Sequence, residues 1–132
     1  MYEGEVYIKL IDIGSLYGAP KEMVEKVKHA TAKDNTITEG KKDEIRGYFK
    51  LLIKHDLLEK PYFKMKLFES EIVNVFVNET NYLKIKPLID NLNRDEEKIK
   101  VKFRGDKKEK DIYFANEIIS INKVKGKTDW KK

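Results

Sequence analysis

Apolar residues in the first half of the chain are spaced first as in a strand and then as in helices. Residues 5–13 form a β-branched and apolar run that predicts a first strand. Pro20 then gives a helix start signal, and apolar residues recur every three to four positions over residues 21–30, which predicts a helix. A second, stronger helical pattern covers residues 43–60, and Pro61 should end that helix.

Beyond Pro61 the period of the apolar residues changes from helical to alternating. The alternating apolar positions are Phe63, Met65, Leu67, Val73, Val75 and Val77. This pattern predicts two strands of a hairpin that bury one common face. A short loop that pairs Leu67 with Val73 puts all six side chains on that face, so we expect Phe63 to lie opposite Val77.

The segment of residues 81–93 is open to two interpretations. Its apolar residues keep helical spacing, which favours a helix that Pro87 kinks. Alternatively, residues 81–86 form a strand and a shorter helix begins at Pro87.

The last hairpin has the clearest alternation of apolar and charged residues in the chain. Its two strands are expected at residues 98–104 and 111–121. A four-residue turn over residues 105–108 would join them. In that register Val101 faces Ile112 on the inner side, and Lys102 faces Asp111 on the outer side.

Together these elements predict a single α+β domain over residues 1–124 and a basic, flexible tail over residues 125–132. One strand, two helices and antiparallel hairpins are compatible with a ferredoxin-like sandwich, in which helices cover one face of the sheet. If residues 81–86 are a strand, a small meander sheet packed on helices is the alternative, and such a sheet could curl toward a small barrel.

Composition excludes several classes of function. With 132 residues and 40% hydrophobic residues, the chain can bury a stable core without disulfides or a structural metal. It has no Cys, which excludes disulfides, thiolate zinc sites and a cysteine nucleophile, and His29 and His55 have no partner at metal-ligand spacing. We expect neither an enzyme nor a cofactor. The acidic N-terminus and the absence of a long apolar run favour a cytoplasmic protein without membrane contact.

Positive charge is concentrated at the C-terminal end. Residues 98–132 hold twelve Lys or Arg against five Asp or Glu, which leaves +7 there, while the whole chain carries +5. Such a block attracts phosphate polymers or acidic protein surfaces. The chain has no Gln and eight Asn, and nearly all its basic residues are Lys, which favours an AT-rich bacterial, phage or mobile-element genome.

The expected outer sheet face combines lysines with aromatic rings. Lysines follow phosphates and rings stack on unpaired bases, so this combination predicts a binding protein for single-stranded nucleic acid. The basic tail with its Trp would add to the contact by becoming ordered on the partner. The predicted binding residues are Lys64, Lys66, Lys98, Lys100, Tyr113, Lys125, Lys127 and Trp130.

Other interpretations of the same residues stay open. The lysines can simply form a solvated face, since Lys102 and Arg104 have expected acidic partners across the hairpin. An interaction or inhibitor module that docks on an acidic host protein would need the same positive charge. A small anion or nucleotide could instead bind at the turn between Asp12 and Pro20, where a strand meets a helix start.

Overall fold

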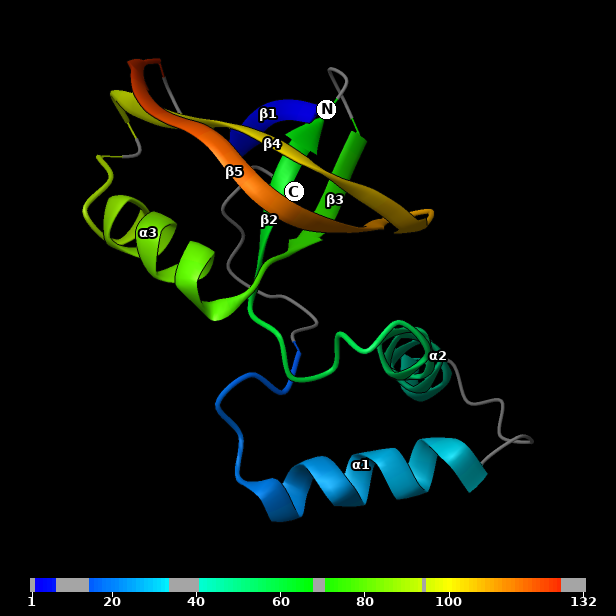
Figure 1. Cartoon of the computed structure of the whole chain (residues 1–132). Helices are drawn as coiled ribbons and strands as arrows, with labels where there is room; N and C mark the ends of the chain where they lie inside the picture. Colours follow the sequence, from blue (N-terminus) through cyan, green and yellow to red (C-terminus); the bar gives the residue numbers. More distant parts are fainter. Residues whose placement is uncertain (1, 7–14, 34–40, 68–70, 94, 127–132) are drawn as a thin grey trace. The chain divides into compact units, whose positions relative to one another are not determined.

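The computed structural model describes residues 2–6, 15–33, 41–67, 71–93 and 95–126 (Figure 1). The chain forms two compact units. The barrel unit comprises Met1–Asp12 and Pro61–Lys132, and the helical unit comprises Ile13–Lys60. The mixture of helices and strands confirms the predicted α+β class.

The barrel unit contains the strands β1 (Tyr2–Val6), β2 (Tyr62–Leu67), β3 (Glu71–Phe76), β4 (Glu97–Glu109) and β5 (Ile112–Lys125) and the helix α3 (Glu79–Asp90). Its five strands close into a barrel in the order β1-β2-β3-β5-β4. Closure occurs because β1 pairs with β2 on one side and with β4 on the other. All neighbouring strands are antiparallel except β3 and β5, which are parallel.

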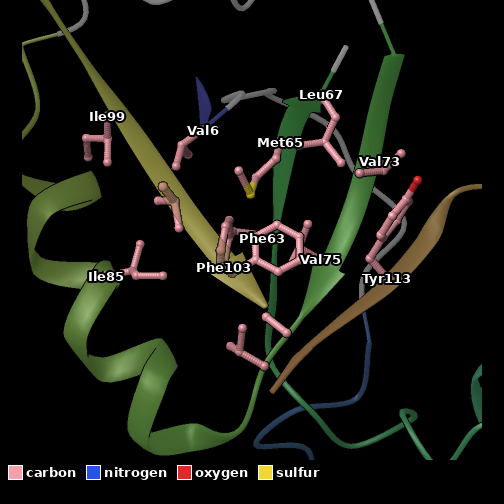
Figure 2. Close-up of a cluster of buried hydrophobic side chains, with 13 residues drawn as sticks. Val6, Phe63, Met65, Leu67, Val73, Val75, Ile85, Ile99, Phe103 and Tyr113 are labelled. Carbon is pink, nitrogen blue, oxygen red and sulfur yellow. The ribbon is translucent and has the colours of Figure 1, made fainter. Parts of the chain in front are cut away.

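Side chains that alternate along the strands fill the barrel interior (Figure 2). Phe63, Met65, Val101 and Phe103 are each less than 7% exposed, and α3 contributes Ile85 to the same cluster. Burying a Val, Leu, Ile or Phe side chain contributes about 1.5–3 kcal/mol. This one cluster is therefore the main stabilising element of the barrel unit.

Two glycines allow paired strands of the barrel to approach closely. Gly4 lies opposite Leu67 of β2 and Val101 of β4, and a Cβ there would lie 2.5 Å from the Lys66 carbonyl oxygen. At Gly105 an added Cβ would collide with the Phe114 carbonyl oxygen. Three register shifts along the β4–β5 ladder mark bulges, which increase strand twist. They account for the curvature of this long yellow and orange ribbon in Figure 1.

The helix α3 resolves the alternatives for residues 81–93 in favour of a helix. The Asn78 side chain caps it by accepting the Asn81 N–H at 2.8 Å. Pro87 lies inside the last turn, and the helix continues through it to Asp90. Tyr82 and Leu88 of this helix pack against the barrel core.

The helical unit contains α1 (Lys21–Lys33) and α2 (Lys41–Lys54), which contact each other. The helix α2 ends at Lys54 and not near Lys60 as predicted. Its last turn closes through hydrogen bonds from the Leu57 N–H to the Leu52 oxygen at 2.7 Å and from the Asp56 N–H to the Ile53 oxygen at 3.1 Å. Asp56 has a φ of 60°, so this is a Schellman end with a non-glycine residue in the left-handed conformation.

Several predicted pairings differ from the structure. The ferredoxin-like sandwich is not confirmed, because the five strands close into a barrel. Met65, and not Leu67, lies opposite Val73; a shift of two residues leaves every side chain on its predicted face, so alternation cannot detect it. The first strand is β1 at Tyr2–Val6, and residues 7–13 of the predicted strand lie outside the described residues.

The last hairpin also has a different register. The strand β4 continues through the predicted turn at residues 105–108 to Glu109, and β5 begins at Ile112. Val101 therefore faces Ile121 and not Ile112. Glycine suggested a turn here, but Gly105 instead permits the close approach of two paired strands.

Candidate nucleic-acid interface

Lysines from β2 and β4 meet on one outer surface of the barrel because β1 lies between these strands. Across the three strands Glu5 is opposite both Lys66 and Lys100, and Glu3 is opposite Lys102. Since neighbouring strands lie about 4.8 Å apart, the Lys66 and Lys100 backbones are roughly 10 Å apart. We call this surface the basic face; it comprises Lys64, Lys66, Lys98, Lys100 and Lys102 with Glu3 and Glu5.

Strand alternation directs these side chains outward. Met65 separates Lys64 from Lys66 and is buried in the barrel core, and Val101 does the same between Lys100 and Lys102. Lys64, Lys66, Lys98 and Lys100 were expected together on one outer face of the sheet, and they lie on the outer side of β2 and β4. The structure adds that β1 lies between these two strands and brings Glu3 and Glu5 onto the same surface.

Two of the lysines are held by neighbouring side chains. The Lys98 Nζ lies 3.2 Å from the Glu5 Oε2, and both side chains are about one-quarter exposed, at 25% and 27%. The Lys64 Nζ donates to the Asn74 Oδ1 at 2.7 Å. These contacts fix the two ammonium groups at the same side of the barrel.

Two other lysines on this face are open to a ligand. Lys100 is exposed and Lys102 is half-buried. Within the part of the chain that the structure describes, neither forms an ion pair. Their charges can therefore be neutralised by an anion from solution without breaking an existing ion pair.

An aromatic pair lies beside the lysines on β2 and β3. The Tyr62 and Phe76 rings are stacked with centroids 5.2 Å apart and planes inclined by 29°. Phe76 is buried, whereas Tyr62 is half-buried. Tyr62 is on the same side of β2 as Lys64, so one partly accessible ring borders the basic face.

Tyr113 is buried and not on the basic face, contrary to the prediction that it lies on the outer side of the sheet. It is 2% exposed inside the barrel, where its ring meets the Tyr2 ring edge-on at a centroid distance of 5.0 Å. Burial raises the pKa of its hydroxyl above the ordinary value of 10.0, with smaller contributions from Glu71 and other acidic groups. Ile112, Tyr113 and Phe114 are consecutive apolar residues, so alternation could not indicate which of them points inward.

The remaining predicted residues lie at or beyond the end of β5. Lys125 is exposed at the last position of β5, opposite Glu97. Lys127 and Trp130 fall outside the described residues.

Three members of the basic face were missed. Lys102 was expected to pair with Asp111, but it lies opposite Ser120 on β5 and Glu3 on β1. Its spacing from Lys98 and Lys100 is the signal that could have identified it, since all three alternate with core residues. Glu3 and Glu5 carry no such signal, because their neighbours on β2 and β4 are about 60 to 100 residues away in the sequence.

The alternative anion site was predicted at the turn between Asp12 and Pro20. The Ser15 hydroxyl of this turn already takes part in hydrogen bonds within the protein. The Ser15 Oγ donates to the Lys60 carbonyl oxygen at 2.6 Å and accepts the Tyr17 N–H at 3.3 Å. Residues 12–14 of that turn are not among the described residues. Across the described ranges no group of three His, Cys, Asp or Glu side chains is placed to hold a metal ion. No helix in the same ranges is long and apolar enough to cross a membrane.

No protein-family model matches the chain, and comparisons with curated proteins and with solved structures find no match. The barrel and its basic face are therefore the features that bear on function.

Proposed function

We propose that this protein binds single-stranded nucleic acid on the basic face, as a binding protein and not as an enzyme. The observation that carries the proposal is the meeting of five lysines from β2 and β4 on one side of the barrel, where the strand β1 between them contributes two carboxylates. The local balance is +3, five minus two, on a surface only three strands wide. Phosphates of a polymer respond to such a local field.

The arrangement of the barrel supports this proposal. Its strand order is β1-β2-β3-β5-β4, and α3 lies between β3 and β4 in the chain. This resembles the oligonucleotide- and oligosaccharide-binding barrel, a five-stranded Greek-key barrel that binds its ligands on the β2–β3 face and adjoining loops. Tyr62 and Lys64 lie on that face here.

The chemistry of the face favours a single strand over a duplex. Lysines neutralise phosphates in either case, but a base can stack on an aromatic ring only when it is not enclosed in a duplex. The half-buried Tyr62 is on the same side of β2 as Lys64, and its ring stacks on that of Phe76. Stacking on such a ring contributes about 1–3 kcal/mol per base.

The test is binding of fluorescent oligonucleotides, followed by anisotropy across a salt series. The Lys100→Gln, Lys102→Gln double variant removes two charges that no ion pair holds, so the fold should be retained. We expect its affinity for a single strand to fall about tenfold or more at low salt. The slope of log K against log salt should become shallower by about 1.4, since each phosphate contact contributes roughly 0.7 for single strands.

A matched control changes the same charge elsewhere. The Lys26→Gln, Lys84→Gln variant alters two exposed lysines of α1 and α3, which lie on helices and not on the basic face. We expect its affinity to remain within about twofold of the unmodified protein. Equal losses in both variants would show that only net charge matters, and absence of single-strand binding at low salt would refute the proposed function.

A further inference from the structure

The centre of the basic face holds a carboxylate, which is unexpected for a surface that binds phosphates. Glu5 lies opposite Lys66 on one neighbouring strand and Lys100 on the other. Its Oε2 accepts from the Lys98 Nζ at 3.2 Å, and its side chain is 27% exposed. Any polymer that contacts lysines on both sides of β1 must pass over this group.

Glu5 has unused capacity to accept hydrogen bonds. A carboxylate offers about four acceptor positions on its two oxygens. Among the described residues, Lys98 is the single donor to Glu5, and the bond uses Oε2. Its other oxygen, Oε1, can therefore accept a hydrogen bond from a ligand.

The sign of the charge decides which ligand group can lie beside Glu5. A phosphate there is repelled, because like charges brought together on a partly buried surface destabilise the complex. A hydroxyl is attracted, because a hydrogen bond to a charged acceptor is about twice as strong as a neutral one. In a nucleic-acid backbone the hydroxyl that recurs at each nucleotide is the ribose 2′-OH, which DNA lacks.

We infer that the basic face binds RNA in preference to DNA, with Glu5 accepting a hydrogen bond from a ribose 2′-OH while the surrounding lysines contact the phosphates. The inference rests on the proposed function. Glu5 is a specificity-determining residue in this arrangement. Its charge lowers the affinity for every phosphate polymer, and a hydrogen bond to a ligand hydroxyl offsets this loss when the polymer has one.

The experiment compares oligouridine with oligodeoxyuridine of the same length and label, by anisotropy at one salt concentration. We expect the unmodified protein to bind oligouridine about tenfold more tightly, the ratio that corresponds to one charge-assisted hydrogen bond. Glu5→Gln keeps an acceptor oxygen but removes the charge, so the ratio should fall. Glu5→Leu removes both, so the ratio should approach one while the affinity for oligodeoxyuridine rises.

The control is Glu59→Leu, which removes a carboxylate that pairs with Lys28 at 3.5 Å in the helical unit. This variant should keep the ratio of the unmodified protein. Melting curves of all variants establish that they are folded, and Glu5→Gln provides the test if the Leu variant fails to fold. Equal affinity for the two oligomers, or an unchanged ratio in both Glu5 variants, overturns the inference and leaves the proposed function intact. If neither oligomer binds, both are overturned.

Discussion

Replacing Gly4 with Ala tests whether β1 is held as closely between its two neighbours as the structure indicates. Gly4 pairs with Leu67 of β2 and with Val101 of β4, in the strand that closes the barrel. An added Cβ would lie 2.5 Å from the Lys66 carbonyl oxygen and 2.6 Å from the Leu67 Cδ2. The leucine side chain can rotate, but the carbonyl belongs to the paired backbone of β2. The backbone of β1 must therefore move relative to that of β2 to make room for the Cβ.

The expected loss of stability follows from two opposing effects. Overpacking that displaces backbone costs about 1–3 kcal/mol. Replacing Gly by Ala also restricts the unfolded chain, which offsets about 0.4–1 kcal/mol of that cost. We therefore expect the barrel unit to lose roughly 1–2 kcal/mol of its free energy of unfolding.

Native-state hydrogen exchange of the β1 and β4 amides measures this loss in the barrel unit itself. A loss of 1–2 kcal/mol accelerates exchange through global opening about 5- to 30-fold. Gly47→Ala is the matched control, because Gly47 is exposed in α2 and an added Cβ would meet nothing within 4 Å. There the same substitution should stabilise the helix by about 0.5–1 kcal/mol and slow exchange of the α2 amides.

The two substitutions should therefore have opposite signs. If Gly4→Ala leaves the β1 and β4 amides exchanging as slowly as in the unmodified protein, the close contact between β1 and β2 is wrong. The barrel closure inferred from that contact would then be wrong as well.

Three further outcomes are expected. Asp56→Gly should stabilise the helical unit by about 0.5–1 kcal/mol, measured by exchange of the α2 amides, because glycine adopts the φ of 60° at this helix end without strain; no gain would contradict the assigned conformation. The raised pKa of Tyr113 means that the folded state holds this proton more tightly than the unfolded state. Stability should therefore fall as the pH rises above about 10, and Tyr113→Phe should flatten that fall in urea titrations. Val101→Asp should prevent cooperative folding, as judged by circular dichroism, because it places an unpaired charge in the core; a soluble, cooperative variant would contradict its inner position.

The inner and outer faces of the strands could be predicted because alternation is a local property. Met65 and Val101 were expected inside and Lys64 and Lys100 outside, and the structure places them so. The inward or outward direction of side chains could not be predicted where apolar and polar residues do not alternate. Tyr113 stands in a run of three apolar residues, so its inward direction depends on where the preceding turn falls.

Strand neighbours could not be predicted, because they depend on pairing between distant segments. Nothing near Glu5 in the sequence indicates that Lys66 and Lys100 will lie on either side of it. The glycine at position 105 was misleading for a related reason. A local pattern associates glycine with a turn, whereas its role here is set by Phe114 on the paired strand.

The pairing of β1 with β4 also determines the order in which this barrel can form during synthesis. Tyr2 is made 101 residues before its partner Phe103, 103 minus 2. At about 5–20 residues per second, β1 waits on the order of ten seconds for β4. The hairpin of β2 and β3 needs only a short loop and can form during that time, so β1 is among the last of the five strands to be enclosed although it precedes the other four in the chain. We therefore expect slow refolding with late protection of the β1 amides, because β1 closes the barrel by pairing with a strand far along the chain.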